Sequence, residues 1–418
     1  MLANLLYALW PYQIFKSVFF RAGIAFLTTY ALIVVFMPPL IRRFRRLGLA
    51  SDFAPESTTG RPYAGAKPIM GGILLLIGIT VSMLLWMEWN QFMVALILIM
   101  LAFGAIGAWD DLAKIEQRRR IEKGLEQKKS YSNKADGASG AIRLGAEFLV
   151  ATMIVLALYR YVTIDGHLVI PGIPLKWWYP YLPRYVFVPF MVIVIVAGAN
   201  AVNLTDGMDS LATVPILTCT LFVGAVAFIG SDHELALRLK LPMLPPALKE
   251  LVIVGAAILS AGFAFLRFNA PPAMITLGDM GALALGAAIS TMFIFAKVEL
   301  FLPLVGGVFV LTTISTILQR VYFKWMLWRK GRDVATRIRF FYRAPYHHHL
   351  QALWHYAEKS PEIVSVWTEG LKKIRIFPPD TEDQLVRAED VNSRVIWRMH
   401  MISIWLVVTA LVVYFKVR

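Results

Sequence analysis

The stretch FMVALILIMLAFGAIGAWDDLAKIEQRRR (92–120) decides the fold class of this chain. Residues 92–109 are apolar and uncharged, and a helix of about 20 apolar residues is long enough to cross a lipid bilayer. The apolar run ends at Asp110 and Asp111, and Lys114 and the arginines of 118–120 follow closely. The stretch therefore predicts a membrane-spanning helix that ends in a strongly charged boundary.

The composition of the whole chain is that of a membrane protein. Of its 418 residues, 58% are hydrophobic and 17% are charged, whereas soluble domains have about 45–50% apolar and about 25% charged residues. The net charge of +15 is typical of Lys and Arg held in cytoplasmic loops. The basic patches alternate with apolar segments, so we expect no nucleic acid partner. The single cysteine, Cys219, excludes an internal disulfide.

We predict an all-α integral membrane protein that forms a single polytopic domain over residues 1–418. About ten apolar segments are candidate transmembrane helices, at residues 18–39, 70–89, 92–109, 142–162, 185–202, 211–229, 249–267, 280–297, 300–323 and 399–417. The sequence contains no Walker loop, GxGxxG or HExxH motif, so soluble nucleotide-binding folds are not supported.

Basic residues are distributed unevenly among the predicted loops. They are dense after the first, third and ninth spans, whereas 87–90 and 163–184 carry few. Because basic loops stay in the cytoplasm, this pattern predicts that both termini are periplasmic and that the polar ends of the third, fifth and seventh spans are cytoplasmic. Residues 163–184 would form an outer loop, and the polar residues 357–392 would form an extra cytoplasmic excursion.

Paired carboxylates end the third predicted span. Asp110 and Asp111 lie one helical turn before Lys114, and one or both could bind a divalent metal ion or a phosphate. The alternative is a solvated helix end with an Asp–Lys ion pair at i+3 or i+4 spacing. Charge near membrane depth is costly and is usually kept for a reason, which makes the pair a candidate site.

A second polar cluster lies between the fifth and sixth predicted spans. In AGANAVNLTDGMDSLA (197–212) polar side chains recur every three positions, at Asn200, Asn203, Asp206 and Asp209. They predict one wall of a nucleotide or metal–diphosphate site. The alternative is a loop rich in Asn and Asp without a ligand.

The third candidate is Asp279, in ITLGDMGALALG (275–286). Gly278 and Gly281 flank it and would let a ligand or another backbone approach closely, and Asn269 lies upstream in the same loop. A lone Asp before a helix is also a common N-cap. The sequence leaves both roles open.

The fourth candidate is the histidine run in APYHHH (344–349). Neighbouring side chains on a helix diverge by about 100°, so His347, His348 and His349 cannot easily share a zinc ion. Contact with a phosphate or diphosphate, or proton transfer near neutral pH, fits them better.

These clusters, in this order, resemble those of the polyprenyl-phosphate N-acetylhexosamine-1-phosphate transferase superfamily. The matching stretches are PIMGG (68–72), DDLAK (110–114), NAVNLTDGMDSLA (200–212), FLRFNAPPA (265–273), LGDMGALALG (277–286) and APYHHH (344–349). The resemblance covers nearly all of 18–350 and the last span, and its motifs are together highly specific. The histidine motif favours the phospho-N-acetylmuramoyl-pentapeptide transferase branch over the N-acetylglucosamine branch.

The resemblance implies an Mg²⁺-dependent transferase of the bacterial cytoplasmic (inner) membrane, with ten spans and its active site on the cytoplasmic face. The donor would be UDP-N-acetylmuramoyl-pentapeptide and the acceptor undecaprenyl phosphate, a membrane lipid. The products would be UMP and lipid I, the first lipid intermediate of peptidoglycan synthesis. A homodimer is left open.

The resemblance also implies roles for single residues. Asp279 matches the family's Mg²⁺ ligand, Asp110 and Asp111 match its paired aspartates, which are often assigned to acceptor activation, and His347 completes the expected catalytic set. The expected substrate-binding residues are Lys67, Lys114, Asn200, Asn203, Asp206, Asp209, Asn269, His348 and His349. A direct transfer and a two-step route through an aspartyl intermediate both stay open.

The sequence departs from the family pattern at four positions. Ala64 and Lys67 stand where a Lys and a Thr are usual, and Ser210 and Ala282 stand where a Gly and a Ser are usual. A sister enzyme that moves N-acetylglucosamine-1-phosphate is the nearest alternative function. A transporter or flippase is the alternative of a different class, but its charged residues should lie near the bilayer midplane rather than crowd one face.

Overall fold

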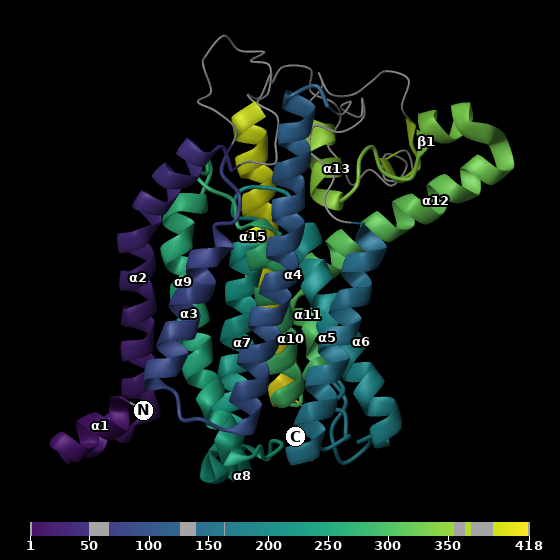
Figure 1. Ribbon diagram of the computed structural model, residues 1–418. Coiled ribbons are helices and arrows are strands. Elements are labelled where there is room, and N and C mark those ends of the chain that lie inside the picture. The colour runs from purple at the N-terminus through teal and green to yellow at the C-terminus, as the bar shows by residue number, and fades with distance from the viewer. Residues whose placement is uncertain are drawn as a thin grey trace.

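The computed structural model describes residues 2–49, 67–125, 139–162, 164–354, 364–368 and 388–416. Within these residues the chain is a bundle of long helices that run alongside one another (Figure 1). The long helices are α2 (Val18–Leu47), α3 (Gly72–Trp86), α4 (Gln91–Glu122), α5 (Gly140–Tyr161), α6 (Arg184–Thr205), α7 (Thr213–Ser231), α9 (Leu251–Asn269), α10 (Gly278–Phe295), α12 (Gly307–Arg337) and α15 (Ala388–Phe415).

Short elements flank or connect these helices. They are α1 (Leu2–Leu9), η1 (Gln13–Lys16), α8 (His233–Leu239), η2 (Pro246–Glu250), η3 (Glu299–Phe301), α11 (Leu302–Val305), β1 (Ile338–Arg339), α13 (Tyr346–Trp354) and β2 (Val364–Ser365). The two strands pair in parallel, and the N–H of Trp367 donates to the carbonyl of Phe340 over 3.1 Å. These contacts anchor residues 364–368, which fall within the expected excursion at 357–392; most of that excursion lies outside the described residues.

The prediction of a helical integral membrane protein is confirmed. Nine of the ten predicted segments fall mainly on one helix each, and the segment 300–323 crosses the break between α11 and α12. Eight helices of the described part are long and apolar enough to cross a membrane. The bent pair of residues 299–305 and α12 is a ninth candidate, and α3 is a shorter apolar helix of 15 residues. The total of ten spans stays a prediction.

The segment predicted as a span at 300–323 is bent, and the two helices that form it remain together a candidate span. The chain breaks at Gly306, and the helices before and after it are bent by 81°. A Cβ at Gly306 would lie only 2.8 Å from the carbonyl oxygen of Leu302, so the glycine makes this sharp turn sterically possible. Beyond it α12 projects away from the bundle (Figure 1), and it is kinked at Gly331, whose φ of +80° is not helical, before it ends at Arg337.

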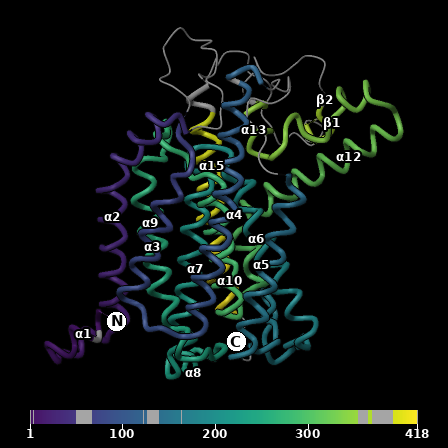
Figure 2. Tube along the Cα trace, viewed as in Figure 1, coloured from purple at the N-terminus to yellow at the C-terminus, as the bar shows by residue number. Residues whose placement is uncertain are grey.

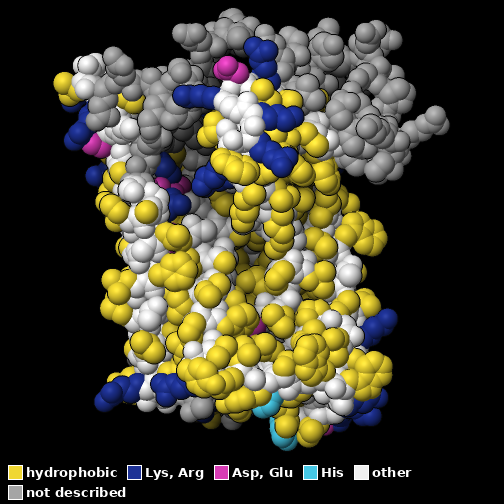
Figure 3. Space-filling view, turned by 90° about the vertical axis from the view of Figure 1, so that its right-hand side faces the viewer, with side chains coloured by type: hydrophobic (Ala, Val, Ile, Leu, Met, Phe, Trp, Pro, Cys, Tyr) yellow, Lys and Arg dark blue, Asp and Glu magenta, His cyan; other side chains and the backbone are white. Residues whose placement is uncertain are grey.

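Apolar side chains cover the middle of the bundle on the outside as well. On the face seen in Figure 3, hydrophobic residues occupy the middle, and Lys and Arg side chains gather toward the two ends. Several large apolar side chains of α5 and α6 are at least half exposed, namely Leu149, Met153, Leu156 and Ile193. This distribution matches a surface that faces the hydrocarbon of a bilayer.

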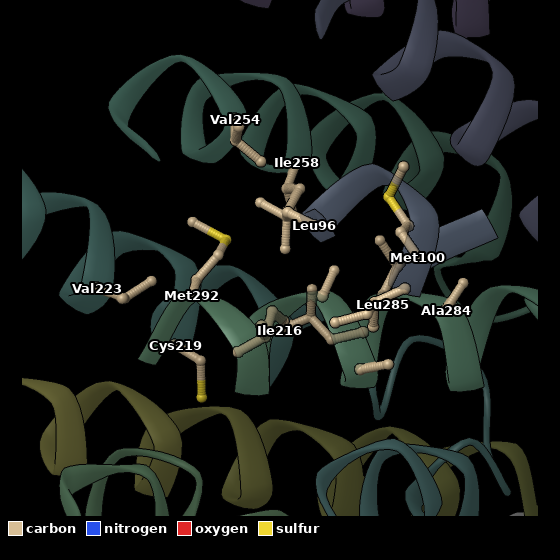
Figure 4. Packing of buried hydrophobic residues seen from close by; sticks show 14 of the residues in the cluster. Leu96, Met100, Ile216, Cys219, Val223, Val254, Ile258, Ala284, Leu285 and Met292 are labelled. Atoms are coloured by element: carbon tan, nitrogen blue, oxygen red, sulfur yellow. The ribbon is translucent and has the colours of Figure 1, made fainter. Parts of the chain in front are cut away.

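The central helix of the bundle is α10. Of its apolar stretch 83% is buried, compared with 28% for α2 and 22% for α5. Leu96 of α4, Ile216 of α7 and Ile258 of α9 pack beside Leu285 and Met292 of α10 (Figure 4). Alanines fill much of the rest of α10, and small residues allow the close packing that holds helices together in membranes.

Glycines bring three helices into contact beside Asp279. A Cβ on Gly107 of α4 would lie 2.3 Å from the carbonyl oxygen of Asp279, and one on Gly72 of α3 would lie 2.3 Å from the Cα of Gly281. The N–H of Gly72 also donates to the carbonyl of Leu277 over 2.9 Å. The PIMGG stretch thus holds the loop that leads into α10, which explains its place among the matching motifs.

The two ends of the bundle differ. We call the end that carries α13 the α13 end; α1 and the last turns of α15 lie at the opposite end (Figures 1 and 2). At that opposite end Arg21 of α2 forms two hydrogen bonds of 2.8 Å with Glu250, and the two residues are only 3% and 5% exposed. The N–H of Glu88 also donates to Glu250 over 2.8 Å. This buried pair ties α2 to the start of α9.

We expect Glu250→Gln to lower the free energy of unfolding by about 3–5 kcal/mol, because the buried Arg21 guanidinium loses its buried counter-charge and keeps only the exposed carboxylate of Glu88, 3.7 Å away. The measurement is denaturant unfolding in mixed micelles. Glu234→Gln is the control, because its pair with Arg238 is exposed and such pairs contribute at most about 1 kcal/mol. Equal losses in the two variants would contradict the structural role of the Arg21–Glu250 pair.

Candidate active site

The predicted polar clusters meet at the α13 end of the bundle. Asp110 and Lys114 lie toward the end of α4, Asn200 and Asn203 lie in the last turns of α6, and Asp279 lies in the first turn of α10. Since α4 and α6 run toward this end and α10 starts from it (Figure 2), side chains from distant parts of the sequence come together there.

Asp110, Lys114, Arg143 and Asp279 form a network that we call the ionic cluster. Lys114 Nζ lies 2.9 Å from Asp110 Oδ2 and 2.7 Å from Asp279 Oδ1. Arg143 Nη1 lies 3.0 Å from Asp110 Oδ2 and 2.9 Å from Asp279 Oδ2. Each cation thus bridges both carboxylates. The expected Asp–Lys pair at i+4 spacing exists, but it belongs to a network between helices, and Asp110 is only 1% exposed.

Sequence reasoning missed Arg143 and Glu147, which both lie on α5. Glu147 is fully buried; it accepts a hydrogen bond from the amide of Asn200 and lies 3.5 Å from Arg143 Nε. The available signal was that both residues are charged and fall inside a predicted apolar span, where an ionisable side chain by default marks a functional site.

Asp111 points away from the ionic cluster and caps the central helix. Its two carboxylate oxygens accept from the N–H groups of Asp279 and Met280 over 3.1 and 3.0 Å. Gly278 has a φ of +77°, and its N–H donates to Asp206 over 3.2 Å. The alternative reading of Asp279 as an N-cap is therefore wrong: carboxylates of two other segments bind the first N–H groups of α10, and Asp279 itself faces the cluster.

The two asparagines of α6 complete this side of the site. The amide of Asn203 donates to Asp279 Oδ2 over 3.2 Å. Asn200 bridges the two residues of α5, since Arg143 Nη2 donates to its Oδ1 over 3.5 Å and its own amide donates to Glu147. Of the four polar residues predicted to recur every three positions, Asn200 and Asn203 thus form a polar face of α6, whereas Asp206 and Asp209 lie beyond its end.

Asp209 and Asn269 lie outside the ionic cluster and hold neighbouring loops. Lys67 Nζ binds both carboxylate oxygens of Asp209 over 2.9 and 2.7 Å, and the N–H of Ala273 donates to the same carboxylate over 3.0 Å. Lys67, which departs from the family pattern, therefore pairs with a predicted site residue. Residues 58–66 lie outside the described part.

The side chain of Asn269 is buried between two loops. It accepts a hydrogen bond from the N–H of Ser210 over 2.9 Å and donates one to the carbonyl of residue 275 over 3.0 Å.

Ser210 shows why a glycine is usual at its position. Its φ is +57°, and this left-handed conformation costs an L-residue roughly 1–2 kcal/mol. Its N–H donates to Asn269, and His400 of the last helix donates from Nε2 to its carbonyl over 3.1 Å. Contacts from two helices thus hold a serine in this conformation.

The three histidines of α13 separate into two groups. His347 and His348 lie against Gly207, since a Cβ on that glycine would lie 2.7 Å from Nε2 of His347 and 3.6 Å from Nε2 of His348. His349 turns away and packs against Phe341 and Tyr342. The predicted divergence therefore holds for His349 only, because the ring centroids of His347 and His348 lie 4.4 Å apart and both rings face the loop that carries Asp206.

The fold and the site together define a polytopic membrane protein with an ionic centre at one end of an apolar bundle. Residues 92–297 match the family described as glycosyl transferase family 4. The chain is also 36% identical over 357 residues to the phospho-N-acetylmuramoyl-pentapeptide-transferase of Aquifex aeolicus (strain VF5), a match that covers 84% of this chain and 90% of that protein. The chain therefore belongs to the family of phospho-N-acetylmuramoyl-pentapeptide transferases.

We expect His349 to make the fold sensitive to acid. Burial lowers the pKa of its imidazole from 6.5 to about 4, and the N–H of Tyr342 donates to its Nδ1 over 3.1 Å. Because the folded-state pKa lies below the unfolded value, this contribution is present above pH 6.5 and is lost as the pH falls toward 4. Between pH 7.5 and 5 the loss should be about 2 kcal/mol.

The measurement is the unfolding temperature in detergent at pH 7.5 and at pH 5. His349→Gln, which keeps an acceptor for the N–H of Tyr342, should lose less stability over this range than the unaltered protein. His233→Gln removes an exposed histidine and should leave the pH dependence unchanged. The same pH dependence in all three proteins would mean that protonation of His349 does not destabilise the fold.

Proposed function

We propose that this protein transfers phospho-N-acetylmuramoyl-pentapeptide from UDP-N-acetylmuramoyl-pentapeptide to undecaprenyl phosphate, giving UMP and lipid I. An oxygen of the lipid phosphate forms a bond to the phosphorus of the sugar phosphate, and the phosphoanhydride bond to UMP breaks. The observation that carries the proposal is the ionic cluster at the end of an apolar bundle. The chain is also similar over 84% of its length to a phospho-N-acetylmuramoyl-pentapeptide-transferase.

The position of the ionic cluster suits a reaction between a lipid and a soluble nucleotide. Asp279 begins α10 and Asp110 lies near the end of α4, so the charged groups lie where the apolar stretches end. The phosphate of a membrane lipid lies at the same depth, with its chain in the hydrocarbon. The charged groups lie toward the ends of the bundle instead of its middle, and this favours a transferase over a transporter.

Lys114 and Arg143 would supply most of the electrostatic stabilisation that comes from the protein. Phosphoryl transfer depends mainly on positioning and charge neutralisation, and both cations lie within 3.0 Å of the carboxylates they bridge. The planar fork of Arg143 matches the geometry of a phosphate. Preorganised donors of this kind offset the charge that develops as the anhydride bond breaks.

The acidic side chains of the site fit a magnesium ion. Three carboxylates, those of Asp110, Glu147 and Asp279, pair with only two cations, Lys114 and Arg143. Mg²⁺ is usually held by one or two carboxylates together with substrate phosphates, and in the described residues no group of three His, Cys, Asp or Glu side chains is placed to hold a metal. We assign Asp279 as its ligand, since its side chain is 13% exposed and that of Asp110 only 2%. When bound, the ion would stabilise charge on the leaving UMP.

Asp110 is proposed to act mainly by orienting the two cations. A phosphate monoester has a second pKa near 6, so the acceptor phosphate is largely dianionic at neutral pH and needs no strong base. The carboxylate of Asp110 is buried between Lys114 and Arg143, which favours direct attack by the lipid phosphate over an aspartyl intermediate. His347 and His348, which lie against Gly207, would contact the diphosphate.

The number of spans and the orientation of the chain in the membrane are also part of this proposal. We propose ten spans in the bacterial cytoplasmic membrane, with the α13 end in the cytoplasm and both termini in the periplasm. The excess of basic residues in the loops after α2, α4 and α12 supports it, as does the common position of α1 and the end of α15 at the opposite end (Figure 1).

The donor is tested with purified protein, Mg²⁺ and undecaprenyl phosphate in detergent. UDP-N-acetylmuramoyl-pentapeptide and UDP-N-acetylglucosamine are offered separately, and UMP release is followed. We expect UMP from the first donor only. Release from the second donor only would assign the chain to the sister branch, and no release by folded protein from either donor would contradict the proposed reaction.

We expect Asp279→Asn to abolish UMP release, because an amide cannot replace a carboxylate as a charged Mg²⁺ ligand. Mn²⁺ binding, followed by electron paramagnetic resonance in the presence of donor, should weaken in parallel. Asp333→Asn on the projecting part of α12 is the matched control and should keep both signals, because Asp333 is exposed and distant from the cluster. Normal turnover in Asp279→Asn would refute the assignment.

We expect Arg143→Gln to lower kcat/KM by about 10²–10³-fold, the loss found when one preorganised donor to a transition state is removed. Arg143→Lys should recover part of the rate, because it keeps the charge but loses the fork that bridges Asp110 and Asp279. Arg160→Gln, near the other end of the same helix, is the control and should be nearly neutral. Unchanged kinetics in Arg143→Gln would remove this residue from the site.

A further inference from the structure

A groove of about 430 Å³ lies between α2 and α3, on the outer surface of the bundle. Leu32, Phe36 and Leu40 of α2 line one side, and Leu74 and Ile77 of α3 line the other. Its walls are almost entirely apolar. Among the described residues that line it, one side chain is charged, that of Arg43 on α2 beyond Leu40. The groove therefore combines a long apolar wall with a single cationic group at one end.

The dimensions of the groove match one leaflet of a bilayer. From Leu32 to Arg43 the helix rises by about 16 Å, at about 1.5 Å per residue, and half of the hydrocarbon thickness is about 15 Å. Because α2 runs toward the α13 end (Figure 1), Arg43 lies near the membrane boundary and Leu32 lies near mid-membrane. A chain of one leaflet's length fits the groove, whereas a polyprenyl chain of 55 carbons is several times too long.

The charge around Arg43 favours an anionic ligand. Arg42, Arg45 and Arg46 lie on the same last turns of α2, and all four arginines are exposed. A basic residue at a membrane surface attracts an anionic lipid by about 1 kcal/mol, and a guanidinium can bind two phosphate oxygens at once. Of the four arginines, Arg43 is the one that lines the groove.

We propose that this groove is a binding site for an anionic glycerophospholipid, with one acyl chain between α2 and α3 and the phosphate on Arg43. The site is separate from the ionic cluster, which is built by α4, α5 and α10. The bound chain covers Leu74 and Ile77, on the helix whose first residue, Gly72, packs against Gly281 of α10. A lipid here therefore supports the helix that holds the start of α10.

Native mass spectrometry of delipidated protein tests the headgroup contact. The protein is titrated with phosphatidylglycerol and with phosphatidylcholine of the same acyl chains. Arg43→Gln should weaken phosphatidylglycerol binding about fivefold, the equivalent of about 1 kcal/mol, with little effect on phosphatidylcholine. Arg42→Gln is the matched control, because it removes the same charge from the same turn but does not line the groove. Equal weakening in both variants would mean that the binding depends on diffuse surface charge and not on a contact in the groove, and it would overturn the proposal.

A steric variant tests the apolar wall independently. Ile77 is 50% exposed, so Ile77→Trp should fold, fill the groove and weaken the binding of both phospholipids. Leu84→Trp on the same helix is the control, since Leu84 is 42% exposed and lies outside the groove. Unchanged binding in Ile77→Trp would refute the site. Displacement of phosphatidylglycerol by equimolar undecaprenyl phosphate, with the same dependence on Arg43, would assign the groove to the acceptor lipid instead and overturn the proposal.

Discussion

The pairing of Lys114 and Arg143 with Asp110 and Asp279 is the interaction on which the rest of the site depends. Carboxylates at this depth are stable only when cations or hydrogen-bond donors compensate them, and each cation bridges both. The same requirement fixes the relative positions of α4, α5 and α10, because each contributes a member of the network.

The packing of α10 turns this requirement into a defined geometry. Gly107 and Gly72 let α4 and α3 contact the backbone around Asp279 and Gly281, so the start of α10 cannot shift without a clash. Asp111 then caps the helix from outside, which leaves the side chain of Asp279 free to face the cluster. The fold thus uses one of two neighbouring aspartates for structure and the other for the ionic cluster.

Most of the elements, and the identity of the polar clusters, could be predicted because each depends on local sequence. Apolar runs of spanning length set the helices, and Asn200 and Asn203 recur at a spacing that places them on one face of α6. The bend at Gly306 and the contribution of Arg143 and Glu147 could not be predicted in this way. The bend depends on a steric limit between neighbouring turns, and a charged residue inside an apolar span gives no indication of the helix that it will face.

The sequence by itself determined that this chain crosses a membrane, and it determined which residue types form the polar clusters, because hydrophobicity and side-chain chemistry belong to each residue alone. Only the tertiary structure decided how those residues divide their work. It directed Asp111 to the N–H groups of α10, Lys67 to Asp209 and Arg143 to the two central carboxylates. The physical reason is that a hydrogen bond or an ion pair needs its partner within about 3 Å, and helix packing sets that distance between residues far apart in the chain.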